Sequence, residues 1–168
     1  DRSLGLQIIW HEGIVLGDVN GDGLDDLFVC QPGGLPNRLY VHQPDGTARD
    51  LTREAGLDLL NMTHSALMAD FDNDVDQDLA ITVPPGVLLY ANDGTGKFKP
   101  AGLIGKPDAH ALAAADFDLD GDLDLYVGCY FAPESMSRLP VPYNDANNGA
   151  PNFLLRNGTT TKTAFQIN

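Results

Sequence analysis

Cysteine, basic residues and long apolar runs are all scarce in this sequence of 168 residues. Cys30 and Cys129 form neither a Cys-x-x-Cys motif nor a metal-ligand spacing, so we expect two buried thiols and no disulfide framework. Only 10 basic residues accompany 24 acidic ones, and the formal charge of −14 makes nucleic acids and anionic membrane surfaces poor partners. Apolar runs such as residues 86–90 are far shorter than the roughly 20 residues that a membrane-spanning helix needs. We therefore expect a globular chain that does not insert into a membrane.

Helical patterning is equally scarce. No segment keeps a helical period for more than about two turns, which excludes a helical bundle. The 18 glycines and 11 prolines break the chain into many short segments, a pattern typical of short strands joined by turns. The composition therefore predicts an all-β fold.

An Asp-rich segment of nine residues recurs three times, at 18–26, 70–78 and 116–124. Each copy follows a short apolar strand and precedes a β-rich second strand, and a third strand then leads into an Asp-Gly or Asn-Gly turn, which is typical of hairpins. The expected strands are 14–17, 27–30, 38–41 and 48–51, then 66–69, 79–83, 87–90 and 97–99, and finally 111–115, 125–129, 153–156 and 163–166. Four antiparallel strands in about 50 residues match one blade of a β-propeller.

The repeats predict three four-stranded antiparallel blades, at residues 1–52, 53–100 and 101–168, the last with a long insertion at 132–151. Propellers typically contain about four to eight blades, so three blades do not close a ring. We expect either part of a larger propeller in a longer chain or a ring completed by a second copy. A stacked solenoid is the alternative topology.

Each Asp-rich segment carries oxygen-bearing side chains at its positions 1, 3, 5 and 9. Ca²⁺ prefers six to eight oxygen ligands, and a curled loop of this kind adds the backbone carbonyl of position 7. The sequence therefore predicts up to three Ca²⁺ sites. Their ligands are Asp18, Asn20, Asp22, Leu24 and Asp26; Asp70, Asp72, Asp74, Asp76 and Asp78; and Asp116, Asp118, Asp120, Asp122 and Asp124.

Other interpretations of these segments fit less well. An EF-hand needs a Glu at loop position 12, where the chain has Val29, Ile81 and Val127. Solvated acidic turns would place four or five mutually repelling groups within nine residues three times over. Calcium with a structural role is the better interpretation.

Position 6 of such a loop needs a positive φ, which glycine adopts without strain. Gly23 and Gly121 occupy this position in loops 1 and 3, whereas loop 2 has Val75. A β-branched residue at positive φ is unusual, so we expect loop 2 either to reshape locally or to bind Ca²⁺ more weakly.

These residues resemble the FG-GAP (VCBS-type) calcium-binding repeats, which are similar to the propeller blades of integrin α-subunits. The resemblance rests on the three loops, on the Asp-Leu that opens each following strand, and on His-x-x-x-x-x-Asp-Phe-Asp at 64–72 and 110–118. It implies a β-propeller, Ca²⁺ between the first and second strands, and a role in surface adhesion or recognition. Val75 and Glu12, the latter where the other repeats have His, depart from the pattern.

A ligand face is expected opposite the calcium loops. His64 and His110 stand at the start of first strands, and the insertion at 132–151, which contains Tyr143 and Asn144, emerges on the same side. Long polar loops on a rigid scaffold commonly carry function. In the alternative interpretation the insertion covers a neighbouring blade and the histidines bind backbone groups.

The sequence therefore favours an extracellular, periplasmic or cell-surface module that binds a glycan or a protein. Calcium sites of this kind are weak enough to fill outside the cell and stay mostly empty in the cytosol. No catalytic grouping recurs at meaningful spacing, so we do not expect an enzyme. A glycan-active, polysaccharide lyase-like enzyme is the alternative, with Arg138, Tyr143 or His110 as base, and a purely structural assembly module is another.

Overall fold

The computed structural model describes residues 13–106, 108–130 and 150–158. Every regular element in these ranges is a strand, so the all-β class is confirmed. The strands are β1 (Ile14–Gly17), β2 (Asp26–Val29), β3 (Arg38–His42), β4 (Ala48–Asp50), β5 (Ala66–Ala69), β6 (Asp78–Val83), β7 (Gly86–Asn92), β8 (Phe98–Gly105), β9 (Ala109–Ala115), β10 (Asp124–Cys129) and β11 (Phe153–Leu155). The described residues contain no helix with the length and hydropathy of a membrane span.

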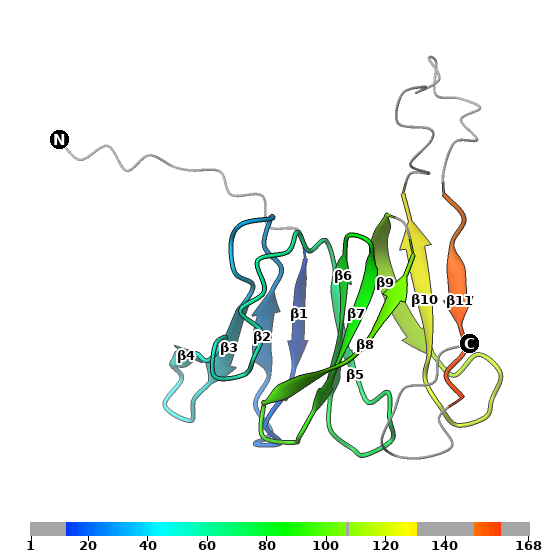
Figure 1. The fold of residues 1–168 in the computed structure, drawn as a ribbon. Coiled ribbons are helices and arrows are strands. Elements are labelled where there is room, and N and C mark those ends of the chain that lie inside the picture. The colour runs from blue at the N-terminus through cyan, green and yellow to red at the C-terminus, as the bar shows by residue number, and fades with distance from the viewer. Residues whose placement is uncertain (1–12, 107, 131–149, 159–168) are drawn as a thin grey trace.

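The strands form three antiparallel sheets in chain order. The sheets have the orders β1-β2-β3-β4, β5-β6-β7-β8 and β9-β10-β11. They stand side by side, with the second sheet between the other two (Figure 1). The first two sheets have the four strands expected of a blade, and the fourth strand expected in the third, at 163–166, lies outside the described residues.

One expected boundary is wrong. β8 continues to Gly105 and pairs with β7 along its whole length, so the second blade extends beyond residue 100. The pairing shifts register next to Tyr90, which lies opposite Pro100. A proline has no N–H for a regular ladder, and a bulge is one of the few places in a sheet where it is tolerated.

The apolar core lies between neighbouring sheets as two clusters. One fills the space between the first and second sheets and includes Phe28, Leu39 and Ile81, while the other joins the second and third sheets around Leu89 and Leu125. All six residues of β6 are buried, because that strand is covered on both faces. The middle blade is thus held on both sides, and the two outer blades on one side each.

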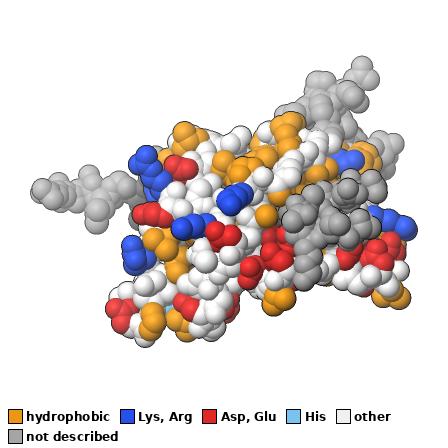
Figure 2. Space-filling model, turned by 60° about the horizontal axis from the view of Figure 1, so that its bottom comes forward, with side chains coloured by type: hydrophobic (Ala, Val, Ile, Leu, Met, Phe, Trp, Pro, Cys, Tyr) orange, Lys and Arg blue, Asp and Glu red, His pale blue; other side chains and the backbone are white. Residues whose placement is uncertain are grey.

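The sheets direct their loops to two opposite faces. The connection between the first and second strands of each sheet lies at the lower end in Figure 1, and the first strands start at the upper end. Acidic side chains gather over the face that carries the first-to-second connections (Figure 2). Cys30 is buried as expected, whereas Cys129 is only half-buried, and no disulfide joins them.

Candidate metal centre

The three Asp-rich loops are closed by the same backbone hydrogen bonds. The carboxylate at position 1 accepts from the N–H groups of positions 5 and 6, and the carboxylate at position 5 accepts from the N–H of position 7. The donor pairs on position 1 are Asp22 and Gly23 on Asp18, Asp74 and Val75 on Asp70, and Asp120 and Gly121 on Asp116, all between 2.7 and 3.1 Å. Each loop is therefore curled around its own carboxylates.

The curl requires positive φ at two positions of every loop. Position 6 has φ of 83° at Gly23, 82° at Val75 and 97° at Gly121. Position 4, which sequence reasoning missed, is also left-handed, and in loop 3 it is Leu119 with φ of 63°. Val75 thus adopts the backbone of the glycines, so the expected local reshaping of loop 2 does not occur. That loop 2 binds Ca²⁺ more weakly stays a prediction.

The aspartates at position 9 are the most buried carboxylates of the loops. Asp26, Asp78 and Asp124 are each at most 1% exposed. Each accepts one N–H from position 2 of its own loop and one from the last residue of its third strand or, in the third sheet, from the residue two positions beyond that strand. The donors are Val19 and His42, Phe71 and Asn92, and Phe117 and Asn157, at 2.8 to 3.0 Å. These aspartates join each loop to its hairpin, and each oxygen keeps a second lone pair for a metal ion.

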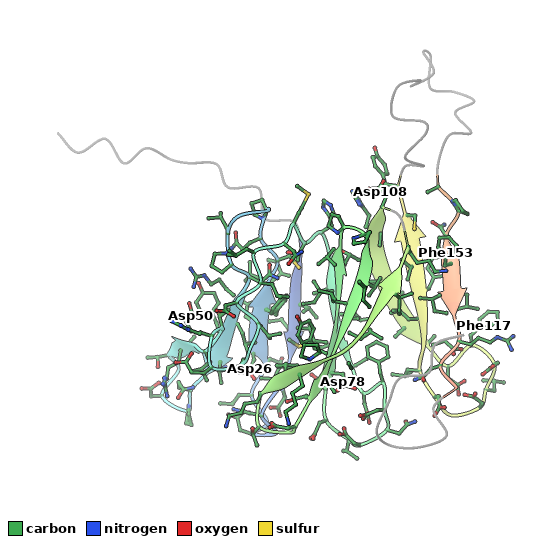
Figure 3. The ribbon with its side chains drawn as sticks, in the orientation of Figure 1. Asp26, Asp50, Asp78, Asp108, Phe117 and Phe153 are labelled. Atoms are coloured by element: carbon green, nitrogen blue, oxygen red, sulfur yellow. The ribbon has the colours of Figure 1, made fainter. Side chains whose placement is uncertain are left out.

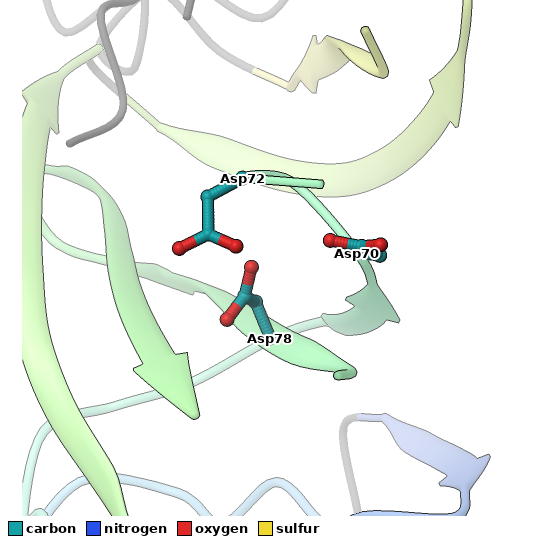
Figure 4. A group of neighbouring side chains, drawn as sticks. All are labelled: Asp70, Asp72 and Asp78. Carbon is teal, nitrogen blue, oxygen red and sulfur yellow. The ribbon is translucent and has the colours of Figure 1, made fainter. Parts of the chain in front are cut away.

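Loop 2 brings three carboxylates into one cluster. Oxygens of Asp70, Asp72 and Asp78 lie within 4.8 Å of one another. The carboxylates of Asp72 and Asp78 point toward each other, with Asp70 beside them (Figure 4). Asp72 is 7% exposed, and its buried Oδ1 has no hydrogen-bond partner.

The electrostatics of loop 2 are unfavourable without a cation. Burial, together with repulsion from Asp74, raises the pKa of Asp72 above its ordinary value. Burial also raises the pKa of Asp78 to about 7, although two backbone N–H groups act in the opposite direction. A divalent cation would neutralise this cluster and give Asp72 Oδ1 a partner, so the donor set fits a hard metal ion.

The other two loops are more open. Oxygens of Asp116, Asp118 and Asp120 in loop 3 lie within 4.8 Å of one another, and Arg156 lies 3.4 Å from Asp118. Among the described residues, loop 1 has no such group of three carboxylates, because its position 3 is Asn20. The Asn20 amide instead donates to Asp22 at 3.0 Å.

The first and last aspartates of loop 1 have opposite pKa shifts. Desolvation acts to raise the pKa of Asp18, but the N–H groups of Gly23 and Asp22, with those of the two residues before them, outweigh it and lower that pKa. In the same loop, burial raises the pKa of Asp26, and the charges of Asp22 and Asp18 act in the same direction.

Comparison with known families identifies the repeat. The model of the FG-GAP-like repeat matches residues 18–81 and 70–127, so its two matches begin at the first aspartates of loops 1 and 2 and together span more than half of the chain. The chain belongs to the FG-GAP-like repeat family. No curated protein matches it significantly.

Successive FG-GAP-like repeats are linked at their loops by asparagine side chains. Asn92 Nδ2 donates to the carbonyl of Val19 in loop 1 at 2.8 Å, and Asn157 Nδ2 donates to the carbonyl of Phe71 in loop 2 at 2.6 Å. Since the N–H of Asn92 also binds Asp78, which holds Phe71, the links join into one continuous series of hydrogen bonds. The sequence did not indicate this role for either asparagine, although Asn92 directly precedes the Asp93-Gly94 turn and Asn157 is itself part of the Asn-Gly turn of the third repeat.

The opposite face of the repeats brings the two expected histidines together. The rings of His64 and His110 lie 4.0 Å apart, and Tyr130 stacks on His110 at 5.4 Å with an interplanar angle of 14°. Asp108 Oδ1 lies 3.9 Å from His110 Nδ1. Asp108 stands at the other end of the sheets from Asp26 and Asp78 (Figure 3).

This cluster adds residues that the sequence did not indicate. Asp108 directly precedes β9, and Tyr130 joins the cluster because β10 ends beside the start of β9, where its N–H donates to the Asp108 carbonyl. The expected ligand-face residues Tyr143 and Asn144 lie outside the described residues.

Proposed function

We propose that the three acidic loops bind Ca²⁺ and that the bound ions stabilise the blades of an extracellular or cell-surface binding module. The observation that carries the proposal is the buried, unpartnered Oδ1 of Asp72, which belongs to a carboxylate that faces the carboxylate of Asp78. An orphaned carboxylate oxygen beside two further carboxylates costs free energy, and a cation would remove that cost.

Calcium suits these loops better than magnesium. Ca²⁺ accepts six to eight oxygens in flexible geometry, whereas Mg²⁺ keeps much of its water and demands a near-ideal octahedron. The ligands in each loop would be the side chains of positions 1, 3, 5 and 9 with the carbonyl of position 7. Extracellular modules of this chemistry bind Ca²⁺ with dissociation constants of about 10⁻⁴–10⁻³ M. That range favours an extracellular, periplasmic or cell-surface location.

The proposed ligand face is the end of the sheets that carries His64, His110 and Tyr130. Tyr130 is 60% exposed and stacks on His110, so the cluster offers an aromatic surface with polar edges. Such surfaces suit sugars and peptides, which combine apolar faces with hydrogen-bonding groups. The proposed activity is recognition of a glycan or a protein, without catalysis.

The calcium proposal is tested by thermal unfolding of the whole chain in millimolar Ca²⁺ and in chelator. We expect the unfolding temperature to fall on chelation. The variant Asp72→Asn should lose most of the response assigned to loop 2 and should be more stable than the wild type in chelator, because it removes one repelling charge from the cluster. The control is Asp25→Asn, the same change at an exposed aspartate of loop 1 that lies outside the proposed ligand set.

Two results would contradict the calcium proposal. One is an unfolding temperature that does not change with Ca²⁺. The other is an Asp72→Asn variant that keeps the full calcium response.

The ligand-face proposal is tested on arrays of immobilised oligosaccharides and extracellular-matrix proteins. Tyr130→Ala and His110→Ala should weaken any binding at least 10-fold, while His42→Ala should not, since His42 ends β3 near the calcium loops. Equal loss in all three variants would argue against this face, and formation of unsaturated sugar products would argue for a lyase.

A further inference from the structure

The outer face of the third sheet is equivalent to two faces that are buried elsewhere in the molecule. Three positions of each repeat form this face: position 2 of the loop, the third residue of the second strand, and the residue paired with it on the third strand. The sets are Val19, Phe28 and Leu39; Phe71, Ala80 and Leu89; and Phe117, Tyr126 and Leu154. The first six residues are at most 2% exposed, because the next blade covers them.

The third set is uncovered. Phe117, Tyr126 and Leu154 are 63%, 45% and 37% exposed. With Ala113 and Ala115 of β9 they line a hollow of about 360 Å³. Side chains that two other repeats bury against a following blade are thus presented to solvent in the third, and an exposed apolar face of this kind marks an interaction surface.

The contact between two neighbouring blades, which we call a joint, also has a polar part. The carbonyls of Val19 and Phe71 each accept a side-chain amide from the following blade. Phe117 holds the equivalent position, and within the described residues no such amide reaches its carbonyl. The face therefore offers both halves of a blade joint: an apolar patch and a backbone acceptor.

A complementary surface is exposed at the other end of the chain. Ile14 and Leu16 of β1 are 65% and 63% exposed. Their equivalents in the second blade, Ala66 and Met68, pack into the cluster between the first and second sheets. His42 occupies the place of Asn92, where an imidazole N–H can take the role of the amide donor.

We propose that two copies of this chain associate head to tail, with the outer face of β1–β3 of one copy packed on the Phe117 face of the other. Two such joints related by a twofold axis close a ring of six blades, which lies within the range of about four to eight that propellers adopt. Both surfaces belong to the chain itself and repeat the contacts between its own blades, so a second copy supplies a matching partner for each of them. The proposal is independent of the proposed calcium binding.

The test is the mass of the full chain in solution, by sedimentation velocity and light scattering over a range of concentrations in Ca²⁺. We expect twice the 18.0 kDa of one chain. Phe117→Asp and Ile14→Asp should each weaken self-association by about 100-fold, because every joint of such a homodimer then contains a buried charge. Leu103→Asp, at a 56% exposed position of β8, is the control and should remain dimeric. Circular dichroism shows whether each variant is folded.

Mixing the two interface variants distinguishes this arrangement from others. A head-to-tail dimer of Phe117→Asp with Ile14→Asp retains one unaltered joint, so the mixture should dimerise more strongly than either variant alone. If only Phe117→Asp dissociates the protein, the joint is a symmetric one between two third blades and the proposal is wrong. A wild-type chain that stays monomeric at about 100 µM also overturns it, and leaves the face for a further repeat of a longer chain.

Discussion

Replacing Val75 with glycine should stabilise the protein, although the substitution removes a side chain. Val75 has φ of 82°. The loop holds it in this conformation, because its N–H donates to Asp70 Oδ2 at 3.0 Å and the N–H groups of both neighbours also bind loop carboxylates. Its side chain is 87% exposed and contributes little burial. Glycine would keep the hydrogen bond and relieve the backbone strain that valine carries at this position.

The expected size of the effect follows from two opposing contributions. A non-glycine residue held at positive φ costs about 1–3 kcal/mol, and a β-branched residue lies toward the upper part of that range. Glycine returns about 0.4–1 kcal/mol of this gain through the greater entropy of the unfolded chain. The net stabilisation should be about 1 kcal/mol, which corresponds to a rise of about 2–4 °C in unfolding temperature for a domain of this size.

The assay is thermal and urea unfolding, in both Ca²⁺ and chelator. Gly121→Val is the matched reverse change, because Gly121 has φ of 97° and a Cβ there would meet no atom within 4 Å. It should lose a similar amount of stability through strain alone. A Val75→Gly variant that is less stable than the wild type, or a Gly121→Val variant that unfolds at the wild-type temperature, would refute the reasoning.

Two further predictions concern the hydrogen bonds between repeats and the pH dependence of stability. Asn92→Ala should lower the free energy of unfolding by about 2–3 kcal/mol, because it leaves the carbonyls of Val19 and Gln77 without their donor. Gln43→Ala, whose amide hydrogen bonds stay within the first blade, is the control and should cost less. Equal losses of stability in urea unfolding would contradict this account. A hydrogen bond from Thr52 and the nearby Arg38 lower the pKa of Asp50, so its carboxylate stabilises the fold above the ordinary value of 3.8 and the contribution disappears as the pH falls below it. The stability difference between wild type and Asp50→Asn should therefore shrink from pH 6 to pH 3, and a difference that is constant over this range would count against it.

The strands and the sheet order could be predicted from the sequence, because each repeat contains complete local signals. In the second repeat, the short apolar run 66–69, the run that opens at Asp78 and the Asp93-Gly94 turn specify two strands and a hairpin without reference to the rest of the chain. The end of β8 could not be predicted in this way. Pro100, Gly102 and Gly105 are poor strand formers, and only pairing with β7 across a bulge keeps them in the sheet.

The candidate site could likewise be predicted only in part. Side-chain oxygens at alternate positions could be predicted as a ligand set from spacing alone. Their unequal environments could not, because Asp72 is buried where the third blade packs beside loop 2, and Asp122 and Asn157 of that blade bind the residues on either side of it. The positive φ of Leu119 could not be predicted either, since nothing in a leucine indicates a left-handed backbone.

The series of hydrogen bonds through Asn92 and Asn157 gives the molecule the behaviour of a one-dimensional array. Loops 1 and 2 are each joined to their own hairpin by a position-9 aspartate and to the following repeat by the amide of Asn92 or Asn157, so a disturbance reaches the nearest neighbour directly and more distant repeats only in sequence. Systems with nearest-neighbour coupling melt from their ends, where a unit has one neighbour instead of two. The middle blade of a dissociated single chain should accordingly be the last to exchange its amide protons.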